Sequence, residues 1–132
     1  MKRSYRCKRE RPVYLDIQKI RLPIPGIVSI FHRFSGVALF ICIPVLLWLF
    51  AGTLSHESAF NTYQALVHHP LVKCILFVLL LAYVYHSLAG IRFLLLDIHK
   101  GTELKTARAS AKAVVVCAIV LTVIIYGACL LS

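Results

Sequence analysis

Three long apolar stretches, separated by short polar segments, dominate the pattern of residues along this chain. They cover residues 34–54, 72–96 and 113–131, and a helix needs about 20 apolar residues to cross a bilayer. The first and third stretches carry no charge, and the second holds only Lys73 near its start and Arg92 near its end. The pattern predicts an all-α integral membrane protein with three transmembrane helices, over about residues 25–54, 71–97 and 107–131.

Proline and polar positions divide the chain further. Residues 1–22 are polar and basic, and we expect them to form a segment separate from a helical anchor domain over 23–132. Pro25 suits the first turn of the first helix, and Pro44 should kink that helix because it removes one backbone hydrogen bond in mid-span. The polar connection over 55–70 is expected to have little regular structure.

Composition narrows the classes of function. The 132 residues are 60% hydrophobic, with a mean hydropathy of +0.83, which is far above a soluble domain of this size. Three helices leave no room for a nucleotide-binding or hydrolase fold, so we expect no dehydrogenase active site in this chain. The cysteines show no CxxC pairing, so neither an iron–sulfur site nor a disulfide framework is expected; they are Cys7, Cys42, Cys74, Cys117 and Cys129.

The net charge of +10 is distributed unevenly. Nine Lys and Arg lie in residues 1–33 and five in 92–112, with only Lys73 between them. This positive-inside pattern predicts a cytoplasmic N-terminus and 99–106 connection, and a C-terminus on the far side. The basic N-terminal segment is therefore interpreted as an orientation signal, or as a dock for a partner protein or anionic lipid, and not as a nucleic-acid arm.

His86 is the main candidate for chemistry, because an imidazole at membrane depth is costly and usually functional. Ala82, Ala89 and Gly90 lie one turn either side of it on the same helical face. These small residues predict a shallow groove in which a haem could lie while His86 provides an axial ligand. The alternative is a histidine that donates to a carbonyl of a neighbouring helix, with the small residues serving close packing. The residues alone leave both open.

Ser29 and Arg33 are four apart and share a helical face at the cytoplasmic membrane edge. A hydroxyl and a guanidinium there suit a quinone head group, whose reduction adds negative charge that Arg33 would stabilise. The alternative for Arg33 is a cation that snorkels to the interface. His32 points about 100° away from Arg33, and these two could instead meet the carboxylates of a haem.

Two further charges close the second apolar stretch, and the third stretch has few polar groups. Arg92 and Asp97 are expected to pair with each other or to anchor their helix at the interface. Thr122 and Tyr126 are the main polar side chains of the third stretch, which indicates a scaffold helix.

Three motifs together resemble a known family. Residues 11–16 read RPVYLD, residues 23–36 read PIPGIVSIFHRFSG, and residues 86–97 read HSLAGIRFLLLD. They are similar to the cytochrome b membrane-anchor subunit of bacterial succinate dehydrogenase, respiratory complex II. The family pattern has S-x-x-H-R-x-[ST]-G at the first span and H-x-x-x-G-x-R-H-x-x-x-D at the end of the second. The chain departs from it at Phe93, where many relatives have His.

The resemblance implies a role for four residues. His86 matches the axial ligand of haem b, whose other axial ligand comes from a companion anchor subunit. Ser29 and Arg33 match residues that line the ubiquinone site, and His32 matches a position near the haem propionates, a role that Arg33 shares. The implied partners are a second membrane-anchor subunit, an iron–sulfur subunit and a flavoprotein subunit, in the bacterial inner membrane.

The expected function is therefore that of an anchor and quinone-site subunit of succinate:ubiquinone oxidoreductase. Two alternatives stay open at this point. One is the anchor of a fumarate reductase, which has the same architecture working toward quinol oxidation. The other is a membrane scaffold protein without a cofactor, in which His and Arg serve only helix packing.

Overall fold

The computed structural model describes residues 21–131, which form four α-helices with no strand among them. The helices are α1 (Ile24–Thr53), α2 (Glu57–His68), α3 (Pro70–Asp97) and α4 (Leu104–Leu131). Of these, α1, α3 and α4 are long and apolar enough to cross a membrane, which confirms the three expected helices. The RPVYLD motif and most of the basic N-terminal segment lie outside the described residues.

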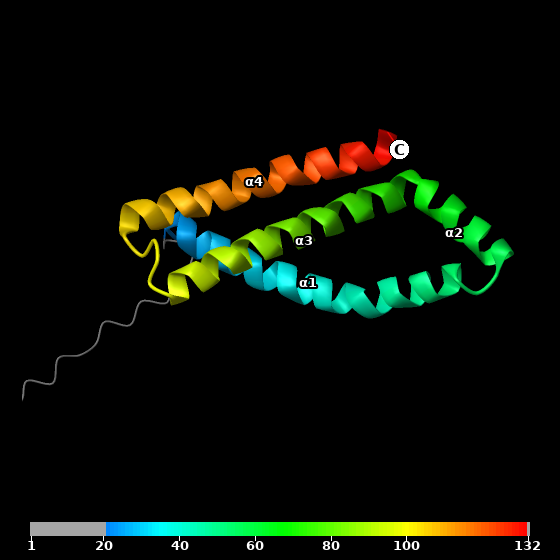
Figure 1. Cartoon of the computed structure of the whole chain (residues 1–132), viewed down its shortest axis with the longest axis horizontal. Coiled ribbons are helices and arrows are strands. Elements are labelled where there is room, and N and C mark those ends of the chain that lie inside the picture. Colours follow the sequence, from blue (N-terminus) through cyan, green and yellow to red (C-terminus); the bar gives the residue numbers. More distant parts are fainter. Residues whose placement is uncertain (1–20, 132) are drawn as a thin grey trace, which may run out of the picture.

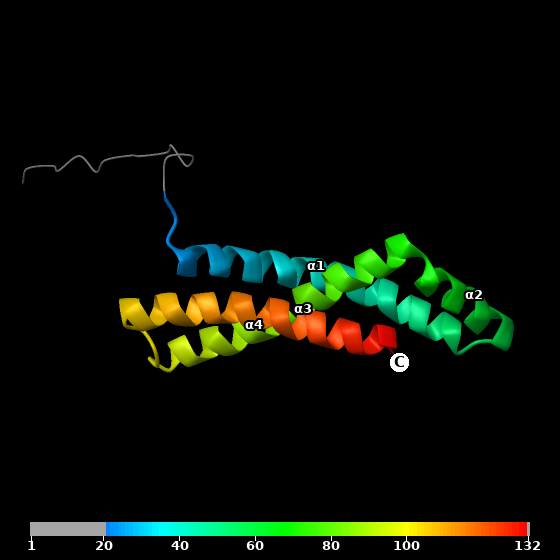
Figure 2. The same ribbon diagram turned by 90° about the horizontal axis from the view of Figure 1, so that it is seen from above.

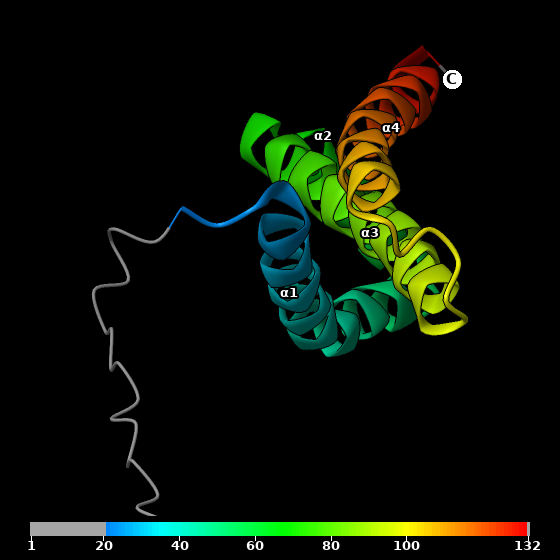
Figure 3. The ribbon, with the colours of Figure 1, turned by 90° about the vertical axis from the view of Figure 1, so that its left-hand side faces the viewer.

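Helix α3 lies between the other two long helices and contacts both of them (Figure 1). The start of α1 and the α3–α4 connection lie at one end of the molecule, and α2 and the end of α4 lie at the other (Figure 2). Seen from the end that holds the α3–α4 connection, α1 and α4 flank α3 (Figure 3). This up-and-down arrangement places the first half of α1 against the second half of α3.

Prolines and a histidine define where the long helices begin. Pro25 lies in the first turn of α1, and Pro70 is the first residue of α3. His69 caps α3, because its Nδ1 accepts a hydrogen bond from the backbone N–H of Leu71 at 3.3 Å. The helix α1 continues through Pro44, and its second half changes direction (Figure 1). A bend is the expected result of the backbone hydrogen bond that Pro44 cannot make.

The expectation of little regular structure over 55–70 is wrong, because Glu57–His68 forms the helix α2. Glu57 lies in its first turn and His68 in its last, the charge placement that the helix dipole favours. The ring of Tyr63 lies directly against Gly52 of α1, where there is no space for a side chain. This contact fixes α2 against the end of α1, and it was not visible in the polar composition of the segment.

Arg92 does not pair with Asp97, one of the two roles expected for these residues, whereas their placement at the membrane interface stays a prediction. Arg92 is only 5% exposed. Its guanidinium Nε donates to Ser110 Oγ at 3.0 Å and its Nη2 donates to the carbonyl of Ala107 at 3.1 Å. Asp97 is exposed at the end of α3. A buried cation requires nearby acceptors, and the first two turns of α4, which begins at Leu104 and not at the expected residue 107, supply them.

Small residues make up the core where the three long helices meet. Val28 of α1, Ala89 of α3 and Ala111 of α4 form one buried cluster. Thr122 is fully buried in α4, and the hydroxyl of Tyr126 donates to the carbonyl of Lys73 on α3 at 3.1 Å. The Thr122 hydroxyl donates to the carbonyl of Ala118 within α4, whereas Tyr126 joins α4 to α3, in agreement with a scaffold role.

Candidate functional site

The ring of His86 lies against the first half of α1. Its Nδ1 is 3.0 Å from the carbonyl oxygen of His32 and 3.0 Å from the hydroxyl oxygen of Ser35. The ring of His32 stacks on it, with the centroids 4.2 Å apart and the planes 5° from parallel. The structure therefore brings together two of the predicted site residues, although they are 54 positions apart in the sequence.

The predicted groove around His86 is occupied in part by α1. Ala89 is 0% exposed because it packs in the core against Val28. A Cβ added at Gly90 would lie 3.5 Å from His32 Nε2, so Gly90 faces the ring of His32. These small residues serve close packing, as the alternative interpretation of His86 proposed. That alternative also describes the hydrogen bond of Nδ1 to a carbonyl of a neighbouring helix.

The second ring nitrogen of His86 is in a different position. No described residue hydrogen-bonds to Nε2, and every buried side-chain nitrogen or oxygen among the described residues has a hydrogen-bond partner. It follows that Nε2 is not completely buried within the described residues and is not engaged by any of them. Histidines that ligate metals almost always donate their other ring N–H to a carbonyl or carboxylate. The packing of Nδ1 and an axial-ligand role for Nε2 are therefore compatible, and the donor set fits a haem iron.

His32 cannot be the second axial ligand of the same iron in this arrangement. A second ligand to the same metal would need space for that metal between its own nitrogen and His86 Nε2. Rings that stack face to face at 4.2 Å leave no such space. The other described histidines lie at helix ends or in connections, namely His56, His68, His69 and His99.

Ser29 and Arg33 lie on α1, with Ser29 half-buried and Arg33 exposed. Neither side chain has a hydrogen-bond partner among residues 21–131. Arg33 is therefore accessible at the surface of this chain, and Ser29 is partly accessible. Any site that they form needs walls from elsewhere in an assembly.

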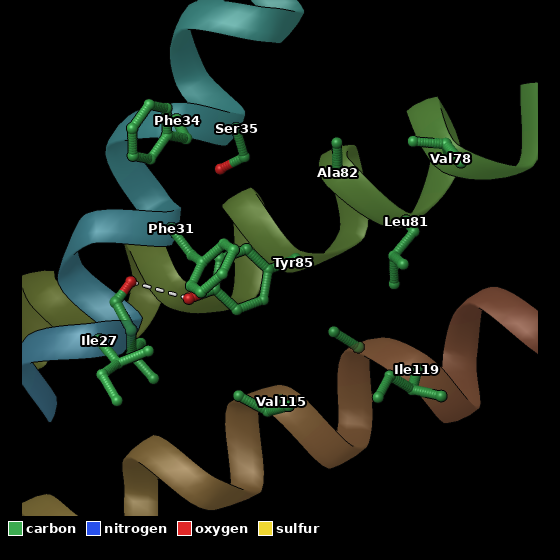
Figure 4. Close-up of a pocket in the computed structure, with 12 residues that line it drawn as sticks. Ile27, Phe31, Phe34, Ser35, Val78, Leu81, Ala82, Tyr85, Val115 and Ile119 are labelled. Carbon is green, nitrogen blue, oxygen red and sulfur yellow. Dashed lines mark hydrogen bonds between the residues drawn. The ribbon is translucent and has the colours of Figure 1, made fainter. Parts of the chain in front are cut away.

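An apolar pocket of about 510 Å³ lies between α1, α3 and α4, and Ala82 of the predicted groove lines it (Figure 4). Phe31 and Phe34 of α1, Leu81 of α3 and Ile119 of α4 are among the residues that line it. Ser29 and Arg33 do not line it, because they lie two residues along from Ile27 and Phe31, about 200° around the helix. The predicted quinone residues and this pocket are thus on different faces of α1.

Two polar residues at the α1–α3 contact were missed by the sequence reasoning. The Ser35 hydroxyl donates to the His32 carbonyl at 2.9 Å as well as contacting His86. The Tyr85 hydroxyl donates to the carbonyl of Val28 at 2.8 Å (Figure 4). The signal for Ser35 was present, since it follows His32 by three residues within the FHRFSG motif and so lies on nearly the same face.

Phe93, where the family pattern has His, packs on His32 and Arg92. The Phe93 ring centroid is 5.1 Å from the His32 ring centroid, and the Arg92 guanidinium carbon lies 5.3 Å from the Phe93 ring centroid. The Phe93 ring thus occupies space beside His32, and it has no titratable group.

Comparison with known proteins agrees with these features. Residues 8–125 match the family model described as the succinate dehydrogenase/fumarate reductase transmembrane subunit. The succinate dehydrogenase cytochrome b556 subunit of Coxiella burnetii is 38% identical over 81% of this chain and 86% of its own length. The subunits of that name from Paracoccus denitrificans and Rickettsia felis are 33% and 32% identical, over 86% and 89% of this chain and 88% and 91% of their own lengths. With three helices able to cross a membrane, this chain belongs to the family of succinate dehydrogenase/fumarate reductase transmembrane subunits.

Proposed function

We propose that this chain provides one axial ligand to haem b, through His86, and part of a ubiquinone reduction site, through Ser29 and Arg33. Its family and relatives make it a cytochrome b membrane-anchor subunit of succinate dehydrogenase, a multi-pass protein of the inner membrane. The haem proposal rests chiefly on the arrangement of His86. Its Nδ1 contacts the His32 carbonyl of α1, while Nε2 is not engaged by any described residue.

The residues around His86 would hold the haem in the following way. His86 Nε2 would present its lone pair, since Nδ1 lies 3.0 Å from the His32 carbonyl, which can only accept a hydrogen bond and so favours the ring proton on Nδ1. The ring of His32 lies beside that of His86, in agreement with a position near the propionates. When bound, haem b supplies one-electron transfer. Since relatives of this chain are named as cytochrome b556 subunits, the cofactor class agrees with the donor that His86 provides.

The assembly supplies what this chain lacks. The second axial ligand would come from a companion anchor subunit, because His32 is stacked beside His86 and is not opposite it. In the most apolar part of α1, 0% of the residues are buried within this chain, so this part of α1 is available for contact with such a partner. The flavin, the succinate pocket and the iron–sulfur clusters belong to a flavoprotein subunit and an iron–sulfur subunit that dock on the cytoplasmic side.

Ser29 and Arg33 would bind the quinone head group. The Ser29 hydroxyl can donate to a quinone carbonyl, and the Arg33 guanidinium favours the negative charge that reduction adds. Both groups are without partners among the described residues, so neither has to break an internal hydrogen bond to bind a ligand. The exposure of Arg33 and the partial exposure of Ser29 agree with a site completed by neighbouring subunits.

Replacing the proposed axial ligand tests the haem assignment. In the purified complex, His86→Ala should abolish the low-spin haem spectrum or greatly reduce haem content, because one iron bond is lost. His68→Ala, at the exposed end of α2, is the matched control and should leave the spectrum unchanged. A low-spin spectrum with full haem content in His86→Ala would show that the ligand is elsewhere. Complete absence of haem from the wild-type complex would favour the scaffold alternative.

Ser29→Ala and Arg33→Leu test the quinone site. Succinate-dependent quinone reduction should fall about tenfold to a hundredfold, at about 1.4 kcal/mol per decade. Electron transfer from succinate to a water-soluble dye should continue, because it draws from the other subunits. Ser87→Ala and Arg108→Leu, at exposed positions on α3 and α4, are the matched controls. Equal losses with dye and quinone would indicate failed assembly and defeat the assignment.

The direction of the reaction separates this proposal from the fumarate reductase alternative. The relatives described above are named as succinate dehydrogenase subunits. We therefore expect initial rates of succinate oxidation by quinone to exceed those of fumarate reduction by quinol in the purified complex. The reverse order of rates would favour the fumarate reductase.

A further inference from the structure

Three atoms meet in a triangle at the α1–α3 contact. The Ser35 hydroxyl oxygen is 2.9 Å from the His32 carbonyl oxygen, and His86 Nδ1 is 3.0 Å from each of them. Ser35 is only 9% exposed, so water has little access to its hydroxyl. The triangle joins a carbonyl, a hydroxyl and an imidazole that the sequence places on two separate helices.

Hydrogen-bond chemistry assigns the proton of the imidazole. The His32 carbonyl can only accept, so a lone pair on Nδ1 would face another lone pair at 3.0 Å. A proton on Nδ1 avoids this repulsion, and it can be shared between the carbonyl and the hydroxyl oxygen. The Ser35 hydroxyl donates its own proton to the His32 carbonyl, which turns an oxygen lone pair toward Nδ1. The triangle therefore selects the tautomer in which Nε2 carries no proton.

Steric contacts fix the ring plane at the same place. A Cβ added at Gly36 would lie 2.8 Å from His86 Cε1, which is closer than real Cβ atoms approach. The ring of His32 covers one face of the His86 ring, in a nearly parallel stack. Gly36 and His32 thus define a slot for the imidazole, and Ser35 determines how the ring sits within it.

We propose that Ser35 is a positioning residue for His86, which holds the imidazole in the tautomer and orientation that present Nε2 to haem iron. This inference rests on the proposed axial role of His86. A hydrogen-bond acceptor at Nδ1 raises the basicity of the ligating nitrogen. Loss of the Ser35 hydroxyl should therefore weaken haem binding and raise the midpoint potential of the haem, while the His32 carbonyl maintains a remaining hydrogen bond.

The test uses the whole complex, purified with its partner subunits. Ser35→Ala should lower haem affinity about tenfold to a hundredfold, the usual effect of losing a group that orients a metal ligand. If the affinity for ferric haem falls tenfold more than the affinity for ferrous haem, the midpoint potential rises by about 59 mV for this one-electron couple. Haem retention, the midpoint potential and the low-temperature EPR signal of the ferric haem would be measured.

Two further variants separate the hydroxyl from packing. Ser35→Thr keeps a hydroxyl that can bond the carbonyl three residues earlier, and its extra methyl has space because Ser35 lines the 510 Å³ pocket. It should restore the wild-type potential and EPR signal. Ser87→Ala removes an exposed hydroxyl that bonds only within α3, and it should change neither quantity.

Each outcome decides the proposal. A potential and EPR signal in Ser35→Ala equal to those of Ser87→Ala would overturn it, as would equal disturbance in Ser35→Ala and Ser35→Thr. If Ser35→Ala does not accumulate, Ser35→Cys is compared with Ser35→Thr. The weaker acceptor sulfur should give the higher potential, and equal potentials would overturn the proposal. A His86→Ala complex with unchanged low-spin haem would instead remove the axial role itself, so the two failures are distinguishable.

Discussion

Substitution of Gly36 by alanine is a sensitive test of the α1–α3 contact. The added Cβ would lie 2.8 Å from His86 Cε1, whereas ordinary contact begins at 3.4 Å. The ring must therefore move by about 0.6 Å, from the difference of those two distances. A shift of that size along the Nδ1 hydrogen bonds would lengthen them from 3.0 Å to about 3.6 Å, which is beyond hydrogen-bonding distance.

The size of the effect follows from two opposing terms. Alanine in a helix interior is more favourable than glycine by about 0.5–1 kcal/mol. Overpacking of a well-packed contact costs about 1–3 kcal/mol. Gly127→Ala, on α4, gives the first term alone, because nothing lies within 4 Å of an added Cβ there. The difference in stability between the two variants should therefore be about 1–3 kcal/mol, with Gly36→Ala the less stable.

Thermal unfolding of the detergent-solubilised complex, with the haem spectrum recorded in parallel, measures this difference. Gly36→Ala should unfold at a lower temperature than Gly127→Ala and should lose part of its low-spin haem. In a His86→Ala background, Gly36→Ala should no longer reduce the stability, because the ring that the added Cβ would contact has been removed. Equal stability and equal spectra for the two glycine variants would refute the proposed placement of the His86 ring.

Three other outcomes are expected. Arg92→Leu should reduce the free energy of unfolding by about 1.5–3 kcal/mol, the value of a hydrogen bond to a charged group, whereas Ser110→Ala should cost about 1 kcal/mol because the bond of Arg92 to Ala107 remains. Equal losses in denaturant titrations would contradict this. Tyr126→Phe should cost about 0.5–1.5 kcal/mol in the same titration by removing one hydrogen bond between helices, and no change would show that this bond is not formed. A cysteine introduced by Ser58→Cys should be labelled from the far side of the membrane; labelling only from the cytoplasm would reverse the predicted topology.

The long helices could be predicted because their signal is local. An uncharged or nearly uncharged run of about 20 apolar residues has few stable alternatives in a bilayer, where every backbone group must be bonded within its own helix. The start of α1 near Pro25 and of α3 near Pro70 followed from the same local rules. The helix α2 was missed because its stability includes the contact of Tyr63 with Gly52, which is not apparent from composition.

The candidate site could be predicted only in part. His86 stood out because a titratable side chain at membrane depth is rare, and Ser29 and Arg33 because they share a helical face at the membrane edge. What surrounds His86 was not visible, since spacing along one helix does not reveal which neighbour packs on it. Small residues such as Ala89 and Gly90 are expected both in a groove for a ligand and in a close contact with another helix, so the sequence does not distinguish the two.

The sequence by itself determined the number of spanning helices, because the length of an apolar run is a local property of the chain. It also predicts the depth of His86 and the side of the membrane on which the charges lie. Only the tertiary structure decided which nitrogen of His86 is engaged. Its partners, the His32 carbonyl and the Ser35 hydroxyl, lie on another helix. The register that brings them to 3.0 Å is set by close packing at Val28, Gly36 and Ala89. In the same way, Arg92 binds α4 and not Asp97, because a buried guanidinium takes the acceptors that packing provides.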